Sequence, residues 1–276
     1  MSYAFKISSG MPVELKDYDP DCDAGLDKNE GKQRFTELSV ELEALQEELY
    51  GAGQHAVLMI LQGMDTSGKD GTIRYVLGAV NPQGCRVETF RVPTEEELAH
   101  DFLWRAHKAA PRRGSIGAFN RSHYEDVLVV RVRELVPEEV WRARYDQINQ
   151  FESLLAANQT IILKFFLHIS REEQERRLLR REQDETKAWK LSPEDWRERE
   201  RWQEYQRAYE DVLSRCSTKT APWYIVPANR KWYRNLAIIE ALVKTLRRHR
   251  REWRETLDAM SRERLTELKA MRQREK

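Results

Sequence analysis

The stretch that decides the fold reads HAVLMILQGMDTSGKDGT and covers residues 55–72. It opens with a short, continuous apolar run, which is typical of a strand buried on both faces of a parallel sheet. It continues with Gly63-x4-Gly68-Lys69, the spacing of a P-loop, in which backbone N–H groups and a lysine surround a phosphate. A segment with apolar residues at helical spacing follows. A glycine turn of purely structural role is the alternative, but the strand before it and the helix after it favour a phosphate loop.

Two positions of this loop depart from the usual pattern. Asp70 stands where a Ser or Thr normally follows the lysine and holds Mg²⁺, and Asp65 lies inside the loop. A carboxylate would repel a bound phosphate unless a cation lay between them, so we expect Asp65 to hold Mg²⁺. The alternative is an Asp65 side chain that points to solvent. The phosphate-binding residues expected here are Gly63, Thr66, Ser67, Gly68, Lys69, Asp70, Gly71 and Arg74.

Strand-like and helix-like segments alternate along the chain around this stretch. We expect further strands at 84–92, 115–119, 160–167 and 222–226, and helices at 32–50, 94–108, 137–158 and 232–250. This alternation predicts an α/β fold with a mainly parallel sheet.

Three other segments lack this pattern. Residues 1–30 carry turn formers and acids without periodicity and predict an extended arm, wrapped on the surface or partly mobile. Residues 171–215 and 251–276 are rich in charges of both signs, which predicts solvated helices. For the first of these two segments a functional role is also expected.

Composition excludes several classes of protein. The 276 residues are 9% aromatic, with eight Trp, which excludes a disordered chain. The apolar runs are too short to cross a membrane. Lys and Arg number 47 against 46 Asp and Glu, so an anion site must be made locally. Three cysteines without metal-ligand spacing predict reduced thiols, and the N-terminus lacks a signal-peptide pattern, so we expect a cytoplasmic protein.

A second group of polar residues follows the expected strand at 115–119, where α/β sheets bind ligands. The segment reads IGAFNRSHYED and covers residues 116–126. Arg121 offers a planar fork to phosphate oxygens, and Glu125 and Asp126 supply carboxylates for a metal. An ordinary polar loop is the alternative.

A third group follows the expected strand at 160–167. Arg177 and Arg181 are four residues apart and therefore share one helical face. In P-loop kinases this position carries a mobile lid whose arginines close over the transferring phosphate. The alternative, an exposed helix with internal ion pairs, is expected to apply to at least half of the arginines in this segment.

With these motifs in order, the chain from about residue 10 to 250 resembles polyphosphate kinase family 2. The motifs that carry the resemblance are Gly63–Gly71, Phe119–Asp126, Lys187–Lys190, Ala221–Tyr224 and Lys231–Trp232. The resemblance implies a thymidylate-kinase-like P-loop fold with a helical lid, as one domain over residues 1–276. It also implies phosphate transfer between inorganic polyphosphate and nucleotides that depends on Mg²⁺, with Mn²⁺ as the alternative ion.

The Phe119–Asp126 segment looks like the subgroup that phosphorylates both nucleoside mono- and diphosphates. Other subgroups typically have Asp and Trp where this chain has Asn120 and His123. The missing carboxylate moves the expected metal role to Asp126, with Glu125 second. The nucleotide-binding residues expected are Asn120, Arg121, Glu125 and Trp189. Trp189 and Trp232 could stack on a base, or pack as buried aromatics.

The residues also suggest how such a reaction would proceed. A nucleotide attacks through a phosphate oxygen that is already anionic, so no general base is needed, and we expect direct transfer without a phosphohistidine. Catalysis then depends on neutralising charge and aligning groups in line. The catalytic residues expected are Asp65, Lys69, Arg121, Asp126, Arg177 and Arg181. A polyanion also needs a basic track beyond the loop, for which the candidates are Lys108, Arg112 and Arg113.

Two other functions compete with this one. A conventional nucleotide kinase with ATP as donor would show a similar P-loop and lid. A nucleic-acid-binding module could use the basic residues 247–254, but these are interleaved with acids and carry no recognisable reading motif. We therefore expect small phosphorylated substrates, no nucleic-acid or membrane partner, and a homo-oligomer, either a dimer or a tetramer.

Overall fold

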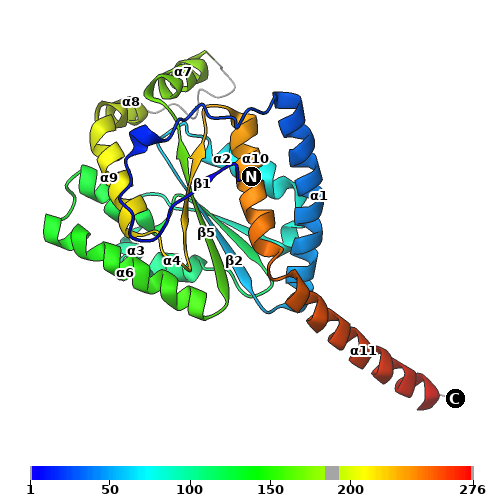
Figure 1. The fold of residues 1–276 in the computed structure, drawn as a ribbon. Helices are drawn as coiled ribbons and strands as arrows, with labels where there is room; N and C mark the ends of the chain where they lie inside the picture. Colours follow the sequence, from blue (N-terminus) through cyan, green and yellow to red (C-terminus); the bar gives the residue numbers. More distant parts are fainter. Residues whose placement is uncertain (1, 184–192, 275–276) are drawn as a thin grey trace.

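The apolar run before the P-loop forms strand β2, Ala56–Gln62, near the middle of a six-stranded sheet (Figure 1). The computed structural model describes residues 2–183 and 193–274, with strand order β1-β6-β5-β2-β4-β3. Neighbouring strands run parallel, except that β1 is antiparallel to β6. The other strands are β1 Phe5–Lys6, β3 Cys85–Thr89, β4 Ile116–Asn120, β5 Thr160–His168 and β6 Trp223–Pro227. The prediction of a mainly parallel α/β sheet is confirmed.

The strand order explains where a ligand can enter. β2 pairs with β4 on one side and with β5 on the other, so the chain winds outward from β2 in both directions. In such sheets the crevice opens at the carboxyl ends of the strands, at the point where the order reverses. Here that point is the carboxyl end of β2, where the P-loop begins.

Helices cover both faces of the sheet, so all of β2 and nearly all of β5 is buried (Figure 1). One face carries α1 Lys28–Ala52, α2 Lys69–Val76 and α10 Lys231–Leu246. The other carries α6 Glu138–Ala157 and α9 Trp202–Arg215. In the described residues, every helix is too short or too polar to cross a membrane.

The expected helix at 94–108 is wrong, because the chain forms two short helices there. These are α3 Glu95–Leu98 and α4 Trp104–Ala109. Thr94 and Glu97 form a capping box at the start of α3. Between the helices, the Asp101 side chain accepts a hydrogen bond from the Leu103 N–H at 2.9 Å. Such a local bond competes with helix continuation.

Several shorter elements complete the fold. The remaining helices before the last are α5 Val129–Val132, α7 Arg171–Glu182 and α8 Pro193–Glu200. Single 3₁₀ turns lie at Leu15–Asp17, Leu77–Ala79, Pro82–Gly84 and His123–Val127.

The N-terminal segment contributes a strand that the sequence did not indicate. Phe5 pairs with Ile225 of β6, and Ile7 donates its N–H to the Trp223 carbonyl at 2.9 Å. Tyr3, Ile7 and Leu15 are buried in the core. A strand of two residues is too short to show a period of alternating side chains, which is why it could not be read from the sequence.

The C-terminal helix, α11 Arg250–Arg274, corrects a second expectation. Its first turn is not solvated: Trp253 is fully buried, and Arg250 and Arg254 both form ion pairs with Glu48 of α1 at 2.9 Å. Residues 261–274 are exposed, as expected for a charged helix, and project away from the sheet (Figure 1).

Candidate active site

Three segments meet at the carboxyl edge of the sheet. The P-loop follows β2, Arg121 follows β4, and α7 begins shortly after β5. The loop turns through Gly63, with φ 149°, and Gly68, with φ 104°, which are conformations that other residues rarely adopt. A Cβ atom on Gly68 would also overlap the Arg234 guanidinium, at 1.9 Å. Glycine is therefore required at both positions.

The P-loop presents polar groups that lack partners. The hydroxyls of Thr66, Ser67 and Thr72 are buried and make no hydrogen bond to any described residue. Thr66 has φ 63°, which is costly for a β-branched residue. Beneath the loop, Lys69 Nζ donates to the carbonyls of Gly63 at 2.8 Å and Met64 at 3.3 Å. Since buried polar groups are normally satisfied, the loop is shaped for a ligand that accepts hydrogen bonds.

The charge of Lys69 depends on its surroundings. Burial, together with the nearby Arg121, lowers the pKa of Lys69 to about 8. A bound phosphate would reverse this shift, since an adjacent anion favours the charged ammonium.

Arg121 connects two of the expected metal-binding carboxylates. Its guanidinium donates to Asp65 at 2.5 Å and to Glu125 at 3.2 Å. Glu125 is the main cause of the raised pKa of Arg121. Glu125 also accepts from Gln62 Nε2 at 3.0 Å, while the buried Oε1 of Gln62 has no partner among the described residues. Two carboxylates and a free amide oxygen form a set of hard oxygen ligands, which suits Mg²⁺.

Asn120 and Asp70 link β4 to the P-loop. Asn120 Nδ2 donates to Asp70 Oδ1 at 2.8 Å. Asn120 therefore lies at the site as expected, and its amide takes part in loop geometry.

Asp126 has different partners from Glu125. Its carboxylate lies 3.1 Å from Arg144 and 3.5 Å from Arg105, and burial raises its pKa. The structure therefore brings Glu125, and not Asp126, into contact with Arg121 and through it with Asp65. Glu125, which was expected second after Asp126, is thus the carboxylate that lies on the P-loop side, because neighbouring residues in a 3₁₀ turn point in different directions.

Arg177 and Arg181 also differ from each other. Arg177 is buried and donates to Glu173 and to four backbone carbonyls, those of Thr66, Ser67, Ala228 and Asn229. These bonds occupy all five N–H groups of a guanidinium, so Arg177 holds the P-loop backbone instead of facing a ligand. Arg181 is partly exposed and lies 3.6 Å from Asp195 of α8.

The sequence reasoning missed three residues that face the site. Arg234 of α10 is 2% exposed, donates to the Ser67 carbonyl at 3.3 Å, and has a pKa lowered to about 9 by burial and by Arg177. Asp195 and Tyr209 lie near Asp65, and burial raises the pKa of both. One signal was available: Arg234 interrupts the apolar stripe of α10, where a charged residue needs an explanation.

The other expected residues lie apart from this group. Arg112 and Arg113 precede β4 and so lie at the opposite, amino edge of the sheet. Lys108 lies over the Trp104 ring, 3.9 Å from its centroid, and Arg74 is exposed on α2. Trp232 is partly buried and packs against Gly31 of α1. Trp189 lies outside the described residues.

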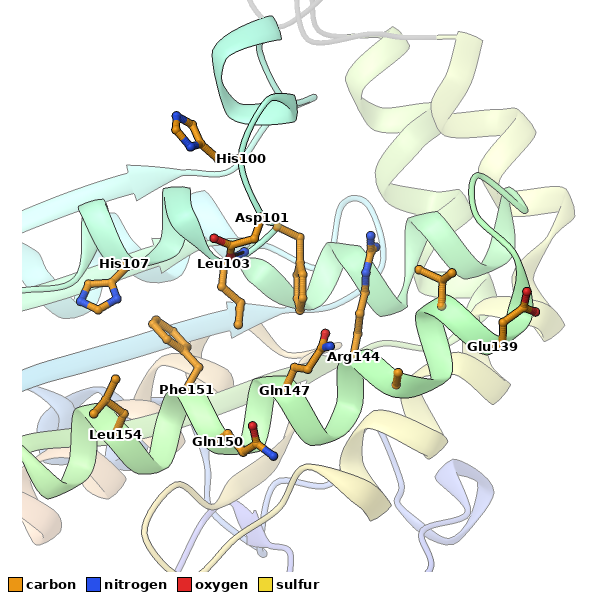
Figure 2. A pocket seen from close by; sticks show the side chains of 13 residues that line it. His100, Asp101, Leu103, His107, Glu139, Arg144, Gln147, Gln150, Phe151 and Leu154 are labelled. Atoms are coloured by element: carbon orange, nitrogen blue, oxygen red, sulfur yellow. Dashed lines mark hydrogen bonds between the residues drawn. The ribbon is translucent and has the colours of Figure 1, made fainter.

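A wide hollow of about 960 Å³ lies away from the P-loop, between α6 and residues 100–107 (Figure 2). Arg144 and Phe151 of α6 line it. Because the Arg144 guanidinium also binds Asp126, this hollow adjoins Asp126 and not the phosphate loop.

Known proteins resemble this chain over most of its length. The family model described as "Polyphosphate kinase 2 (PPK2)" matches residues 25–254. An AMP/ADP-polyphosphate phosphotransferase of Meiothermus ruber is 52% identical, over 88% of this chain and 91% of the relative. An ADP-polyphosphate phosphotransferase of Rhodopseudomonas palustris is 42% identical, over 94% of both chains. The crystal structure of polyphosphate kinase 2 from Arthrobacter aurescens TC1 superposes with a TM-score of 0.84, at 41% identity, covering 88% of this chain and 87% of that one.

Proposed function

Since the chain belongs to the polyphosphate kinase 2 family, we propose that it transfers the terminal phosphoryl group of inorganic polyphosphate to AMP and to ADP, reversibly and by direct in-line transfer. The relative at 52% identity is named for both acceptors, and the relative at 42% identity is named for ADP alone. The pair of acceptors is therefore the part of this proposal that most needs a test.

The observation that carries the proposal is the set of unpartnered hydroxyls in the P-loop. Thr66, Ser67 and Thr72 are buried without a hydrogen-bond partner among the described residues, above a buried Lys69. Phosphate oxygens would accept from all of these groups at once. A phosphate is also the ligand that the positive end of α2 favours.

Asp65 and Glu125 are proposed to hold Mg²⁺, with Gln62 Oε1 beside them. When bound, this ion would neutralise charge on the phosphate oxygens. Arg121 bridges the two carboxylates. Its guanidinium has further N–H groups, which we propose donate to a phosphate oxygen while Glu125 holds the side chain in place.

The remaining groups bind and align the substrates. The attacking oxygen of AMP or ADP is already anionic near neutral pH, so no side chain has to remove a proton. Lys69 and Arg121 neutralise charge on the transferring group, and Arg177 fixes the loop that holds it. Arg181 and Asp195 lie on α7 and α8, which we propose act as the lid that covers the substrates.

The test supplies AMP, long-chain polyphosphate and Mg²⁺, with no adenylate kinase, and follows the nucleotides over time. ADP should appear first and ATP later. If AMP stays unchanged while ADP reacts, the acceptor set is narrower than proposed. If ADP yields no ATP from polyphosphate but AMP accepts phosphate from ATP, the protein is an ATP-dependent nucleotide kinase instead.

A further inference from the structure

The amino edge of the sheet, opposite the P-loop, carries a second hollow of about 290 Å³. It lies where β2, β5 and β6 begin, beside the junction of α10 and α11. Three cations line it: Lys6 of β1, Lys219 before β6, and Arg248 after α10. Hydroxyl groups of Thr160, Thr220 and Tyr224 line it as well. These groups all suit an oxyanion.

Charge at this edge is unbalanced. None of Lys6, Lys219 and Arg248 forms an ion pair with another described residue, and the lining of the hollow contains no carboxylate. Arg112 and Arg113 add two exposed cations at the same edge. Their turn is fixed to it by the Gly114 N–H, which donates to the His55 carbonyl at 2.7 Å. A chain of net charge +1 thus gathers five cations at one edge.

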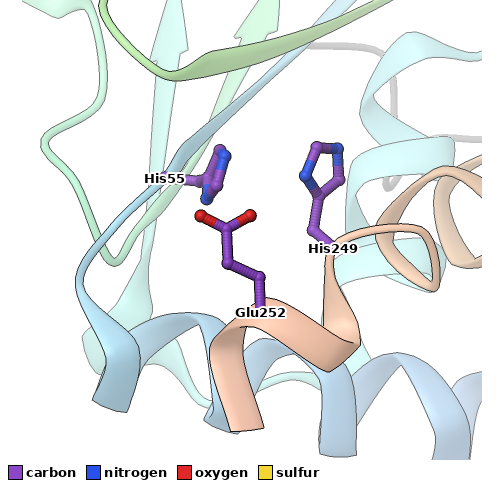
Figure 3. Close-up of side chains that lie close together, drawn as sticks. All are labelled: His55, His249 and Glu252. Atoms are coloured by element: carbon purple, nitrogen blue, oxygen red, sulfur yellow. The ribbon is translucent and has the colours of Figure 1, made fainter. Parts of the chain in front are cut away.

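The His55 imidazole of the hollow offers a hydrogen-bond donor and not a metal ligand. Figure 3 shows His55, His249 and Glu252 close together, with ligand atoms that lie within 4.8 Å of one another. However, His55 Nδ1 accepts a hydrogen bond from the Trp253 indole at 3.0 Å. A neutral ring that accepts at Nδ1 carries its proton on Nε2, which leaves no lone pair there for a metal. Glu252, at the rim, is the one acid of the cluster.

We propose that this hollow binds a second segment of a long polyphosphate chain, away from the segment that reacts. This inference rests on the proposed function, because it takes polyphosphate as the donor. β5 has nine residues, so the two edges lie about 30 Å apart. A long chain can occupy both edges at once, and the second contact then raises its effective concentration at the first. A short donor cannot reach both.

The test compares two double variants that each remove one lysine and one arginine. Lys219→Ala with Arg248→Ala changes the hollow, and Lys269→Ala with Arg272→Ala changes the exposed end of α11 by the same charge. For the first, we expect the KM for long-chain polyphosphate to rise roughly five- to tenfold. Its kcat, its KM for ADP and its inhibition constant for tripolyphosphate should stay unchanged. The control should match the unmodified protein throughout.

Equal KM values for long chains in both variants would overturn the proposal. The proposal would also be overturned if the inhibition constant for tripolyphosphate rose by the same factor as the KM for long chains, because that would indicate a general electrostatic effect. Direct binding of long-chain polyphosphate without nucleotide, measured against salt concentration, separates this inference from the catalytic one. Loss of the two cations should reduce the slope of log affinity against log salt by about 1 to 2. That readout does not require phosphate transfer.

Discussion

Arg121 lies between two carboxylates that would otherwise repel each other. It occupies a left-handed backbone conformation, with φ 61°, which a residue other than glycine adopts at a cost of about 1–3 kcal/mol. Such strain persists only where the surroundings impose it. Here Asp65 and Glu125 both accept from the guanidinium, and the Arg121 N–H donates to the Leu61 carbonyl of β2 at 3.0 Å.

The change Asp65→Asn should lower kcat by about 10²-fold or more, because it removes one negative charge from the proposed metal ligands and keeps their shape. The fold should be unaffected, since Asp65 is partly exposed and its ion pair contributes little to stability. Steady-state kinetics and the thermal midpoint check both statements, with Asp258→Asn on exposed α11 as the control. Activity within about threefold of the unmodified protein, or ~0.65 kcal/mol in the barrier, would remove Asp65 from the metal site.

The lowered pKa of Lys69, about 8, predicts a pH effect. As pH rises through this value the free enzyme loses the ammonium charge, so kcat/KM should fall above about pH 8. The corresponding fall in kcat, the basic limb of its pH profile, should occur at higher pH, because bound phosphate keeps Lys69 protonated. Lys69→Arg should retain some activity and lose this limb. If kcat/KM is flat from pH 7 to 9.5, the ammonium is not needed in the free enzyme.

The effect of Lys69 on stability has the opposite dependence on pH. Between about pH 8 and 10.5 the lysine is protonated in the unfolded chain and largely neutral in the folded one. The contribution of Lys69 to the free energy of unfolding therefore rises with pH over this range.

At the scale of an element, α7 carries two arginines with different surroundings. Arg177 is buried and holds the P-loop, whereas Arg181, one turn later, is partly exposed and faces Asp195. The i,i+4 spacing places both arginines on one side of the helix, but only Arg177 contacts the P-loop. Spacing alone therefore could not separate the arginine that holds the P-loop from the one that stays partly exposed.

Arg177→Ala should lower the free energy of unfolding by about 3–5 kcal/mol, because it removes five hydrogen bonds from a buried site and takes their side-chain donor from the carbonyls of Thr66, Ala228 and Asn229. Arg181→Ala should leave stability nearly unchanged and raise the KM for substrates. Urea denaturation and kinetics on both variants check the contrast. Comparable stability of the two variants would contradict the buried role of Arg177.

α11 divides in the same way into a packed and a projecting part. Removing residues 261–276 should change neither the thermal midpoint nor kcat, since residues 261–274 are exposed. Trp253→Ala should cost about 3–5 kcal/mol of stability, because it empties a fully buried site and removes a donor from His55. A truncated protein that unfolds at a lower temperature would show that the projecting part has a partner.

At the scale of the whole molecule, the sequence predictions that hold are those that concern the buried strands of the sheet. Apolar runs and the P-loop spacing were enough to place β2, β4, β5 and β6, because strands buried on both faces leave a continuous signal. The same signal put Asp65, Lys69, Arg121 and Glu125 at one edge. It could not find β1, which has two residues, or Arg234, which lies far along the chain from the loop that it contacts.

Two expected residue groups lie elsewhere than beside the P-loop, for reasons that the order of the elements explains. Arg112 and Arg113 come before a parallel strand, and the P-loop comes after one, so they lie at opposite edges of the sheet. Asp126 and Glu125 are adjacent, but only the backbone turn after Arg121 decides which of them faces the loop. Direction along a strand can be read from sequence, while the direction of a side chain in a turn cannot.

The fully buried pairing of His123 with Glu152 limits how acceptor preference could evolve or be engineered. Glu152 also receives hydrogen bonds from Tyr124 and Lys164, all at zero or near-zero exposure. Introducing the Trp of other subgroups at position 123 would bring a larger ring and a differently placed donor into this closed network. We expect strong epistasis: His123→Trp alone should be poorly tolerated, and a compensating change at Glu152 should recover more stability than the single effects predict. Acceptor switching would then require paired substitutions, one of them on α6 and distant in sequence from the segment Phe119–Asp126.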